Sequence, residues 1–184
     1  MIPTSLTISD SSDTGCQLDL QHFQRHNSFG FTCFTAVPTT YPNHTHLFTA
    51  NSIEEQIKTT LIGGPIKSTK IGKIYTQEQL IRVTDCLLHN ELGTIVIDLP
   101  LLSEHISQHD QYVFLHSIRS LPVILCGSAP STQHSLNHRA LQSFFTEVTL
   151  SEQSSPLSAL ITALSSQDIK GDLLVETIKK ALPN

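Results

Sequence analysis

Two aspartates stand at the ends of predicted strands, where a carboxylate is well placed for chemistry. Asp10 follows the apolar run 5–8, and Asp98 follows the continuous apolar run 94–97. The carboxyl ends of strands in an open parallel sheet border the ligand crevice, so both aspartates can hold a polar ligand or a magnesium-bridged phosphate. Strand-end carboxylates also cap the turns that follow them, and the sequence does not decide between these two roles.

Histidine and cysteine offer a weaker case for a metal site. A zinc site needs a third and a fourth ligand, and no residue at a matching spacing supplies them for the three close histidine pairs, His44/His46, His105/His109 and His134/His138. We therefore favour surface or capping histidines. No Cys-x-x-Cys pair is present, which predicts reduced, mostly buried thiols at Cys16, Cys33, Cys86 and Cys126.

A phosphate cradle usually needs glycines in a loop that enters a helix. Gly15 stands in such a loop, but neither Gly-x-Gly-x-x-Gly nor Gly-x-x-x-x-Gly-Lys-Ser/Thr occurs, and no glycine lies between Gly127 and Gly171. Ser154-Ser155-Pro156 offers an anion contact through a helix dipole, although ordinary helix capping explains these residues better.

Short apolar runs alternate with helical patterns, which predicts βαβ units, a mainly parallel sheet and one α/β domain spanning residues 1–184. The predicted strands are 5–8, 30–37, 68–74, 94–97, 123–126 and, at an edge, 144–150. The strand 94–97 should be buried on both faces. The first predicted helix is 15–26, and the second is opened by a capping box at Ser52 and stopped at Gly63. Thr76 caps a third helix, whose inward residues are Leu80, Thr84, Leu87 and Leu88. A fourth helix is predicted around 113–118, and two more begin near Ser155 and Asp172. Residues 101–111 carry no clear pattern, and residues 127–138 are predicted to be a loop.

Composition excludes several classes of protein. The formal net charge is −5, and no run of basic residues is longer than Lys179-Lys180, so a nucleic-acid partner is not expected. No stretch of eighteen apolar residues and no basic, apolar amino-terminal segment is present, so neither membrane insertion nor export is expected. A cytoplasmic location follows as an expectation.

Six stretches occur in an order that resembles a known family. They are Ser5-Leu6-Thr7-Ile8-Ser9-Asp10-Ser11-Ser12, Gly15-Cys16-Gln17-Leu18-Asp19-Leu20, Thr35-Ala36, Lys70-Ile71-Gly72, Ile95-Val96-Ile97-Asp98 and the helical pattern from Pro156 to Leu164. They resemble the hydroxymethylpyrimidine/phosphomethylpyrimidine kinases, the thiamine-pathway members of the ribokinase superfamily. The resemblance implies a shortened, ribokinase-like three-layer α/β sandwich and a small pyrimidine or phosphate ligand. It also implies ATP and magnesium as cofactors if the chain is active, and it favours a homodimer.

On the substrate side, the resemblance assigns Asp10, Gly15, Thr40, Lys73 and Asp98 to the site. The chain departs from the family there, because Thr40 falls where the family has a pyrimidine-reading glutamine. Lys73 likewise falls where the family has a substrate-packing methionine. Lys73 should point into the crevice and favour an anionic ligand over neutral hydroxymethylpyrimidine. The alternative is that Lys67, Lys70 and Lys73 form a solvated basic edge.

On the nucleotide side, the family's Lys-Gly-Gly falls on Cys126-Gly127-Ser128. Its glycine-rich anion hole with the catalytic cysteine falls on the segment 152–155, so Ser155 takes the place of the cysteine and Ser154 lies beside it. A family segment after Pro100, near the nucleotide, is missing. The backbone amides of such an anion hole donate hydrogen bonds to the charge that develops during phosphoryl transfer, and losing one such donor costs about a hundredfold to a thousandfold in rate. A serine without an adjacent base is also a poor base itself.

The sequence leaves three functions open. The first is a divergent relative of these kinases with weak or lost phosphotransfer, which binds a pyrimidine, a phosphate or a partner enzyme. The second is a working kinase in which Asp10 or Asp98 organises magnesium and the Ser154 and Ser155 amides bind the anion. The third is an interaction module, for instance a dimer partner, which conspicuous exposed apolar residues on one helix would favour.

Overall fold

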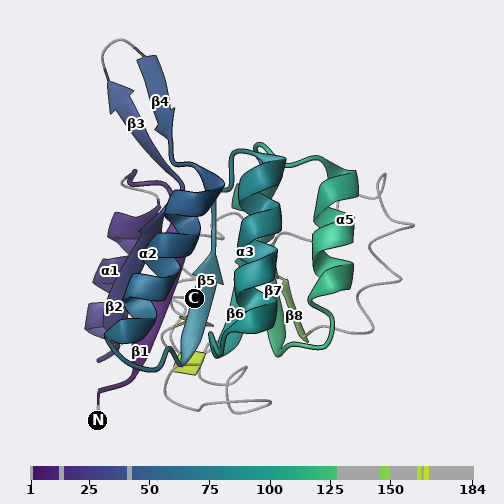
Figure 1. Ribbon diagram of the computed structural model, residues 1–184. Helices are drawn as coiled ribbons and strands as arrows, with labels where there is room; N and C mark the ends of the chain where they lie inside the picture. The colour runs from purple at the N-terminus through teal and green to yellow at the C-terminus, as the bar shows by residue number, and fades with distance from the viewer. Residues whose placement is uncertain are drawn as a thin grey trace.

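The computed structural model describes residues 2–12, 15–40, 43–127, 146–149, 161–162 and 164–165. These residues form a six-stranded parallel sheet in the order β2-β1-β5-β6-β7-β8, together with a separate two-stranded hairpin, β3-β4 (Figure 1). The elements in chain order are β1 Thr4–Ser9, α1 Cys16–Arg25, β2 Phe29–Phe34, β3 Ala36–Thr40, β4 Asn43–Leu47, α2 Ala50–Ile62, β5 Ser68–Ile71, α3 Gln77–His89, β6 Thr94–Asp98, α4 Leu99–Ser103, α5 Gln108–Ser117, β7 Val123–Gly127 and β8 Thr146–Thr149.

Alternate residues of β1 show that helices cover both faces of the sheet. Leu6 and Ile8 are fully buried in the apolar core, which also contains Ile53 of α2. Thr7 points to the other face and donates a hydrogen bond to Asp19 of α1. Since successive side chains of a strand point to opposite faces, α1 lies behind the sheet, and α2, α3 and α5 lie in front of it (Figure 1). The predicted α/β fold with a mainly parallel sheet is therefore confirmed.

Strand β6 lies within this sheet, between β5 and β7. Its residues Ile95, Val96 and Ile97 are all buried, as the continuous apolar run predicted. Strand β8 lies within the predicted strand 144–150 and pairs with β7 at the end of the described strand order, and its predicted edge position stays a prediction.

Helix α2 begins earlier than the sequence predicted. Its N-cap is Thr49, whose Oγ1 accepts a hydrogen bond from the Ser52 amide at 3.1 Å, so the predicted cap at Ser52 is wrong. A threonine and a serine three residues apart both offer capping hydroxyls, and the sequence pattern alone favoured the second of them. Gly63 ends the helix as predicted.

Helix α3 begins after Thr76 as predicted, because Thr76 Oγ1 accepts from the Gln79 amide at 3.2 Å. Leu80 and Leu87 are buried, but Leu88 is 43% exposed, so its inward assignment was wrong. Leu88 is one residue beyond Leu87, and one residue turns the helix by about 100°. That rotation carries the side chain off the buried face.

The predicted strand 30–37 is two strands in two different sheets. Strand β2 ends at Phe34, and the chain bends at the buried Thr35 before β3 begins. The Thr35 amide donates to Ser9 O at 2.9 Å, and its hydroxyl donates to Lys73 O at 2.8 Å. Strand β3 then pairs antiparallel with β4, which the sequence did not predict, in a hairpin that projects from the body of the protein (Figure 1).

The predicted strand 68–74 is shorter in the structure, because β5 ends at Ile71. Beyond it, the hydroxyl of Ser9 accepts a hydrogen bond from the Lys73 amide at 3.1 Å. This contact draws the chain across the end of β1, and residues 72–76 become a loop at the carboxyl edge of the sheet.

Residues 101–111, which carried no clear pattern, contain the end of α4 and the start of α5. Asp98 caps α4, and Ser107 caps α5. At the carboxyl-terminal end of the chain, residues 161–162 and 164–165 are helical, within the predicted helix that begins near Ser155. Most of the loop predicted at 127–138 and the helix predicted to begin near Asp172 lie outside the described residues.

All four cysteines are buried free thiols, as predicted. Burial raises the pKa of the Cys16 thiol to about 12, and the Asp19 carboxylate adds to this rise. Burial also raises the pKa values of Cys33 and Cys126. Thiols that ionise only above their ordinary range make unfolding more favourable as the pH rises through about 9, where the unfolded thiols lose their protons.

These buried thiols predict slow alkylation of the folded protein. At pH 8, iodoacetamide should modify Cys16, Cys33 and Cys126 at least about a hundredfold more slowly than free cysteine, because reaction requires both opening and ionisation. Mass spectrometry of timed samples, with a sample in denaturant as the control, measures the rates. Rapid modification of Cys126 in the folded protein would contradict its enclosed position.

Candidate ligand site at the carboxyl edge of the sheet

Asp10 lies at the carboxyl end of β1 and is almost fully buried. Its Oδ1 accepts hydrogen bonds from the Ser12 hydroxyl at 2.6 Å and from the Ser12 amide at 3.3 Å. Its Oδ2 accepts from the Tyr75 hydroxyl at 2.9 Å. Both oxygens of this carboxylate are therefore already bonded within the chain.

Gly15 is placed against this carboxylate. The Cys16 amide donates to Asp10 O at 3.0 Å, so the start of α1 approaches the end of β1 closely. A Cβ atom on residue 15 would lie within 2.5 Å of Asp10 O and closer still to Asp10 Oδ1. Only glycine fits here without a shift of the backbone, which explains this position independently of any ligand.

Lys73 lies in the loop after β5 and points toward Asp10. Its Nζ is 3.8 Å from Asp10 Oδ2 and 3.1 Å from Glu104 Oε2, and its side chain is 16% exposed. The lysines do not form a solvated basic edge, because Lys70 is fully buried and pairs with Asp19 at 2.5 Å. That alternative is wrong because β5 directs Lys70 under α1.

Tyr75, Glu104 and His105 also lie beside Asp10 and Lys73. Sequence reasoning missed Tyr75 and Glu104, and it considered His105 only as a metal ligand. The Tyr75 and His105 rings stack with their centroids 4.3 Å apart. Burial and the hydrogen bond to Asp10 raise the pKa of Tyr75, which keeps its hydroxyl a donor. Only one signal was available in the sequence, namely that Tyr75 follows Lys73 in the strand-end loop. Glu104 and His105 lie in the stretch without a pattern.

Asp98 is fully buried at the end of β6, and its Oδ1 accepts from the Leu101 amide at 3.3 Å. It therefore caps α4, and the hydrogen bonds of Asp10 likewise brace the turn at Ser12. The structure shows the capping role for both aspartates. Their role in binding a ligand stays a prediction.

Among the remaining predicted residues, the described ones lie away from Asp10. Thr40 lies at the end of β3 in the projecting hairpin, four residues beyond Ala36 and thus roughly 13 Å along an extended strand. Cys126 is fully buried at the end of β7, beside Gly127. Ser154 and Ser155 lie outside the described residues.

The comparisons with known proteins identify the family. A family model described as phosphomethylpyrimidine kinase matches residues 10–113, which is more than half of the chain. The chain belongs to the phosphomethylpyrimidine kinase family. The matched region contains Asp10, Gly15, Thr40, Lys73 and Asp98, so the resemblance seen in the sequence is confirmed.

Solved structures of this family and of related vitamin kinases share the fold. The phosphomethylpyrimidine kinase of Clostridium difficile 630 aligns with a TM-score of 0.77 and 16% identity, over 97% of this chain and 96% of that chain. A structure described as the last common ancestor of two groups of vitamin kinases aligns with a TM-score of 0.72 and 19% identity, over 98% of each chain. The Bacillus subtilis pyridoxal kinase in an ADP complex aligns with a TM-score of 0.73 and 15% identity, over 98% of this chain and 90% of that chain. No curated protein matches the sequence.

Within the described part of the chain, the residues of this family member give only partial support for a nucleotide and magnesium site. The Cys126 side chain is enclosed and cannot contact a nucleotide, whereas Gly127 is partly exposed. In the same part, no three histidine, cysteine or acidic side chains gather into a cluster, although magnesium held by substrate phosphates needs only one or two carboxylates. None of the described helices is long and apolar enough to cross a membrane.

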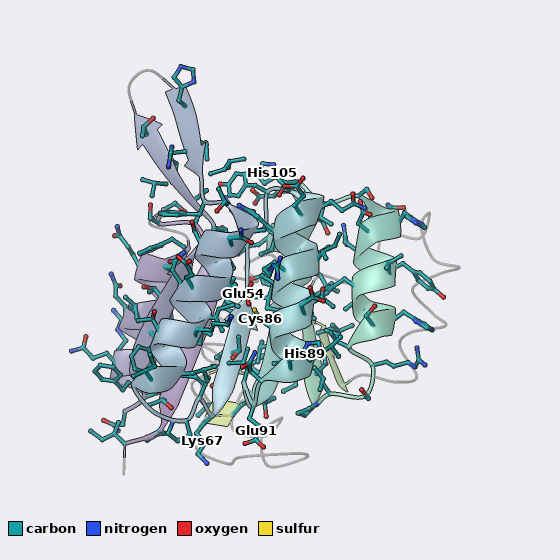
Figure 2. All side chains as sticks on the ribbon, viewed as in Figure 1. Glu54, Lys67, Cys86, His89, Glu91 and His105 are labelled. Atoms are coloured by element: carbon teal, nitrogen blue, oxygen red, sulfur yellow. The ribbon has the colours of Figure 1, made fainter. Side chains whose placement is uncertain are left out.

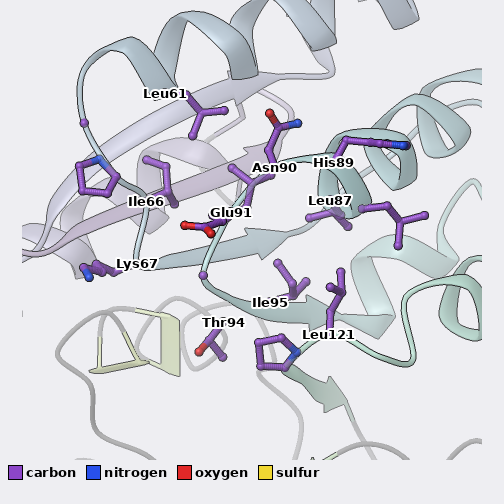
Figure 3. A pocket seen from close by; sticks show the side chains of 16 residues that line it. Leu61, Ile66, Lys67, Leu87, His89, Asn90, Glu91, Thr94, Ile95 and Leu121 are labelled. Atoms are coloured by element: carbon purple, nitrogen blue, oxygen red, sulfur yellow. The ribbon is translucent and has the colours of Figure 1, made fainter.

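A groove of about 790 Å³ lies at the opposite, amino-terminal edge of the sheet (Figure 3). Lys67 and Glu91 border it, and Figure 2 shows both at the other end of the molecule from His105. None of the predicted site residues that the structure describes lines this groove. We therefore assign the candidate site to the carboxyl edge, where Asp10, Lys73 and Tyr75 converge.

Proposed function

We propose that this member of the phosphomethylpyrimidine kinase family binds a small pyrimidine or its phosphate and has weak or lost phosphotransfer from ATP. The observation that carries the proposal is that both oxygens of the Asp10 carboxylate already accept hydrogen bonds within the chain. Ser12 and Tyr75 already supply its hydrogen bonds, and Lys73 lies 3.8 Å away.

A carboxylate that already accepts hydrogen bonds from its own chain is a poorer partner for a substrate hydroxyl than a free carboxylate. A hydroxymethyl group that took the place of the Tyr75 hydroxyl at Asp10 Oδ2 would leave that partly buried hydroxyl in need of a new partner. A hydrogen bond to a charged group contributes about 1.5–3 kcal/mol, and the new hydrogen bond from the ligand would have to offset that loss. This cost opposes productive positioning, and positioning together with electrostatic stabilisation supplies most of the catalysis in phosphoryl transfer.

The departures on the nucleotide side support the same proposal. ATP with magnesium is the cosubstrate that the family implies, and one similar structure is described as an ADP complex. In this chain the backbone of Gly127 and the segment that contains Ser154 and Ser155 would have to hold the phosphates. Ser155 in place of a cysteine provides no ionisable thiol near neutral pH.

Isothermal titration of the full chain tests the binding part of the proposal. Hydroxymethylpyrimidine, its phosphate and Mg-ATP are titrated separately into the wild-type protein and into Tyr75→Phe. We expect a pyrimidine ligand to bind, and we expect Tyr75→Phe to bind the alcohol more tightly, because Asp10 Oδ2 is then free to accept from it. If neither protein binds a pyrimidine, the proposed ligand class is wrong.

One observation favours a second candidate, the interaction module. Ile81 and Leu88, seven residues apart on the outer face of α3, are 55% and 43% exposed. Apolar residues on one face of a helix are typical of an interface. A homodimer through this face predicts a sedimentation mass near twice that of the chain, which Ile81→Asp should return to the monomer value. A wild-type monomer would contradict it.

A further inference from the structure

The two carboxylates that contact Lys73 differ in how firmly they are held. We propose that the Glu104 carboxylate is an internal competitor for the Lys73 ammonium, and that its displacement opens a subsite for the phosphate of a ligand. This inference rests on the proposed function, because it names the ligand group that this edge of the sheet would prefer.

Asp10 is the fixed neighbour of Lys73. Its side chain is 2% exposed, and its oxygens are held by Ser12 and Tyr75. It therefore cannot turn away when a ligand arrives. Its negative charge offsets the ammonium at 3.8 Å without making a close hydrogen bond.

Glu104 is the displaceable neighbour. Its carboxylate contacts the ammonium at 3.1 Å, yet its side chain is 43% exposed. The His105 ring also lies near this carboxylate, with Nε2 at 4.0 Å. Ion pairs this open to water contribute little to stability, so a competing anion can replace the Glu104 carboxylate at small cost.

The backbone around Glu104 need not move for this exchange. Glu104 is the C-cap of α4, and its flanking residues Leu102 and Ile106 are buried in the core. The neighbouring His105 ring is stacked on Tyr75. Rotation of one exposed side chain is therefore enough to expose the ammonium to a ligand.

Charge explains why a phosphate suits the opened subsite. Lys73 faces two carboxylates, so the group has a formal charge of −1 while Glu104 is in place, and it repels anions. When Glu104 turns away, the Lys73 ammonium offers three N–H donors beside Asp10, and lysine is a common phosphate ligand. A neutral alcohol gains nothing from this exchange.

The test is titration of inorganic phosphate into the full chain at low ionic strength. Glu104→Gln removes the competing charge, and we expect it to lower the phosphate Kd roughly two- to fivefold, the range expected for one exposed ion pair. The gain should shrink at high salt. The matched control is Glu91→Gln, an exposed glutamate at the opposite edge of the sheet, which should leave the Kd unchanged.

The double variant Lys73→Met with Glu104→Gln separates this subsite from a general charge effect. It should bind phosphate no better than Lys73→Met alone. An unchanged Kd in Glu104→Gln, or an equal gain in Glu91→Gln, would overturn the inference. If wild type binds pyrimidines but Glu104→Gln binds phosphate no more tightly than wild type, the proposed competition by Glu104 is wrong and the proposed function stands. If Glu104→Gln binds phosphate more tightly but no pyrimidine binds, the competition by Glu104 stands and the proposed function is wrong.

Discussion

Replacement of Lys70 by methionine is expected to lower the free energy of unfolding by about 3–5 kcal/mol. Lys70 and Asp19 are both fully buried, and their side chains are 2.5 Å apart. Methionine fills a similar volume but leaves the Asp19 carboxylate without its ammonium. Urea denaturation followed by circular dichroism measures the loss.

The pH dependence of this loss tests its cause. Burial raises the pKa of Asp19, and the Lys70 ammonium and the Thr7 hydroxyl oppose that rise. Without the ammonium the pKa rises further, and a carboxyl with a raised pKa destabilises the fold increasingly as the pH climbs from its ordinary value of 3.8 toward the raised value. The gap between wild type and variant should therefore narrow as the pH falls from about 7 to about 4.

The control is the double variant Asp19→Asn with Lys70→Met. Asparagine is neutral and keeps an acceptor for the Thr7 hydroxyl, so the double variant should recover much of the lost stability. A loss below about 1 kcal/mol in Lys70→Met, a value typical of exposed pairs, would mean that water reaches this pair.

Replacement of Gly15 by alanine should lower the free energy of unfolding by about 1–3 kcal/mol, because overpacking forces a backbone shift. The new Cβ would overlap Asp10 O and Asp10 Oδ1. The shift should also loosen the hydrogen bond from Tyr75 to Asp10, so the same variant should change pyrimidine binding. Thermal unfolding and titration of the same sample report the two effects.

Gly127→Ala is the matched control. A Cβ there would lie 3.4 Å from Pro100 Cδ, an ordinary contact, so its stability should stay within about 0.5 kcal/mol of wild type. Equal losses in the two variants would mean that the close approach at Asp10 is not what makes Gly15 necessary.

Local patterns were enough to predict most of the sheet. The apolar runs located β1, β6 and β7, and Thr76 located the start of α3. Prediction failed where contacts distant in sequence decide the structure. The bend at Thr35 depends on Ser9 and Lys73, which lie 26 and 38 residues away by number. No property of the run 30–37 itself reveals that bend.

The candidate site, like the fold, was predictable from the sequence only in part. Asp10 and Lys73 were predictable, because residues at the ends of parallel strands meet at one edge. Tyr75, Glu104 and His105 join them only through the packing of the α4–α5 turn against the loop after β5. The hydrogen bond from Tyr75 to Asp10 could not be predicted either, since it depends on the orientation of the Tyr75 ring.

The rate of ADP release tests the central claim most directly. Purified protein, Mg-ATP and hydroxymethylpyrimidine or its phosphate are assayed beside the Clostridium difficile phosphomethylpyrimidine kinase under identical conditions. The account predicts a pyrimidine-dependent rate at least about a hundredfold lower for this chain, the cost of losing one transition-state donor. A rate within about tenfold of that enzyme would contradict it, and would mean that the chain still performs the phosphotransfer of its family.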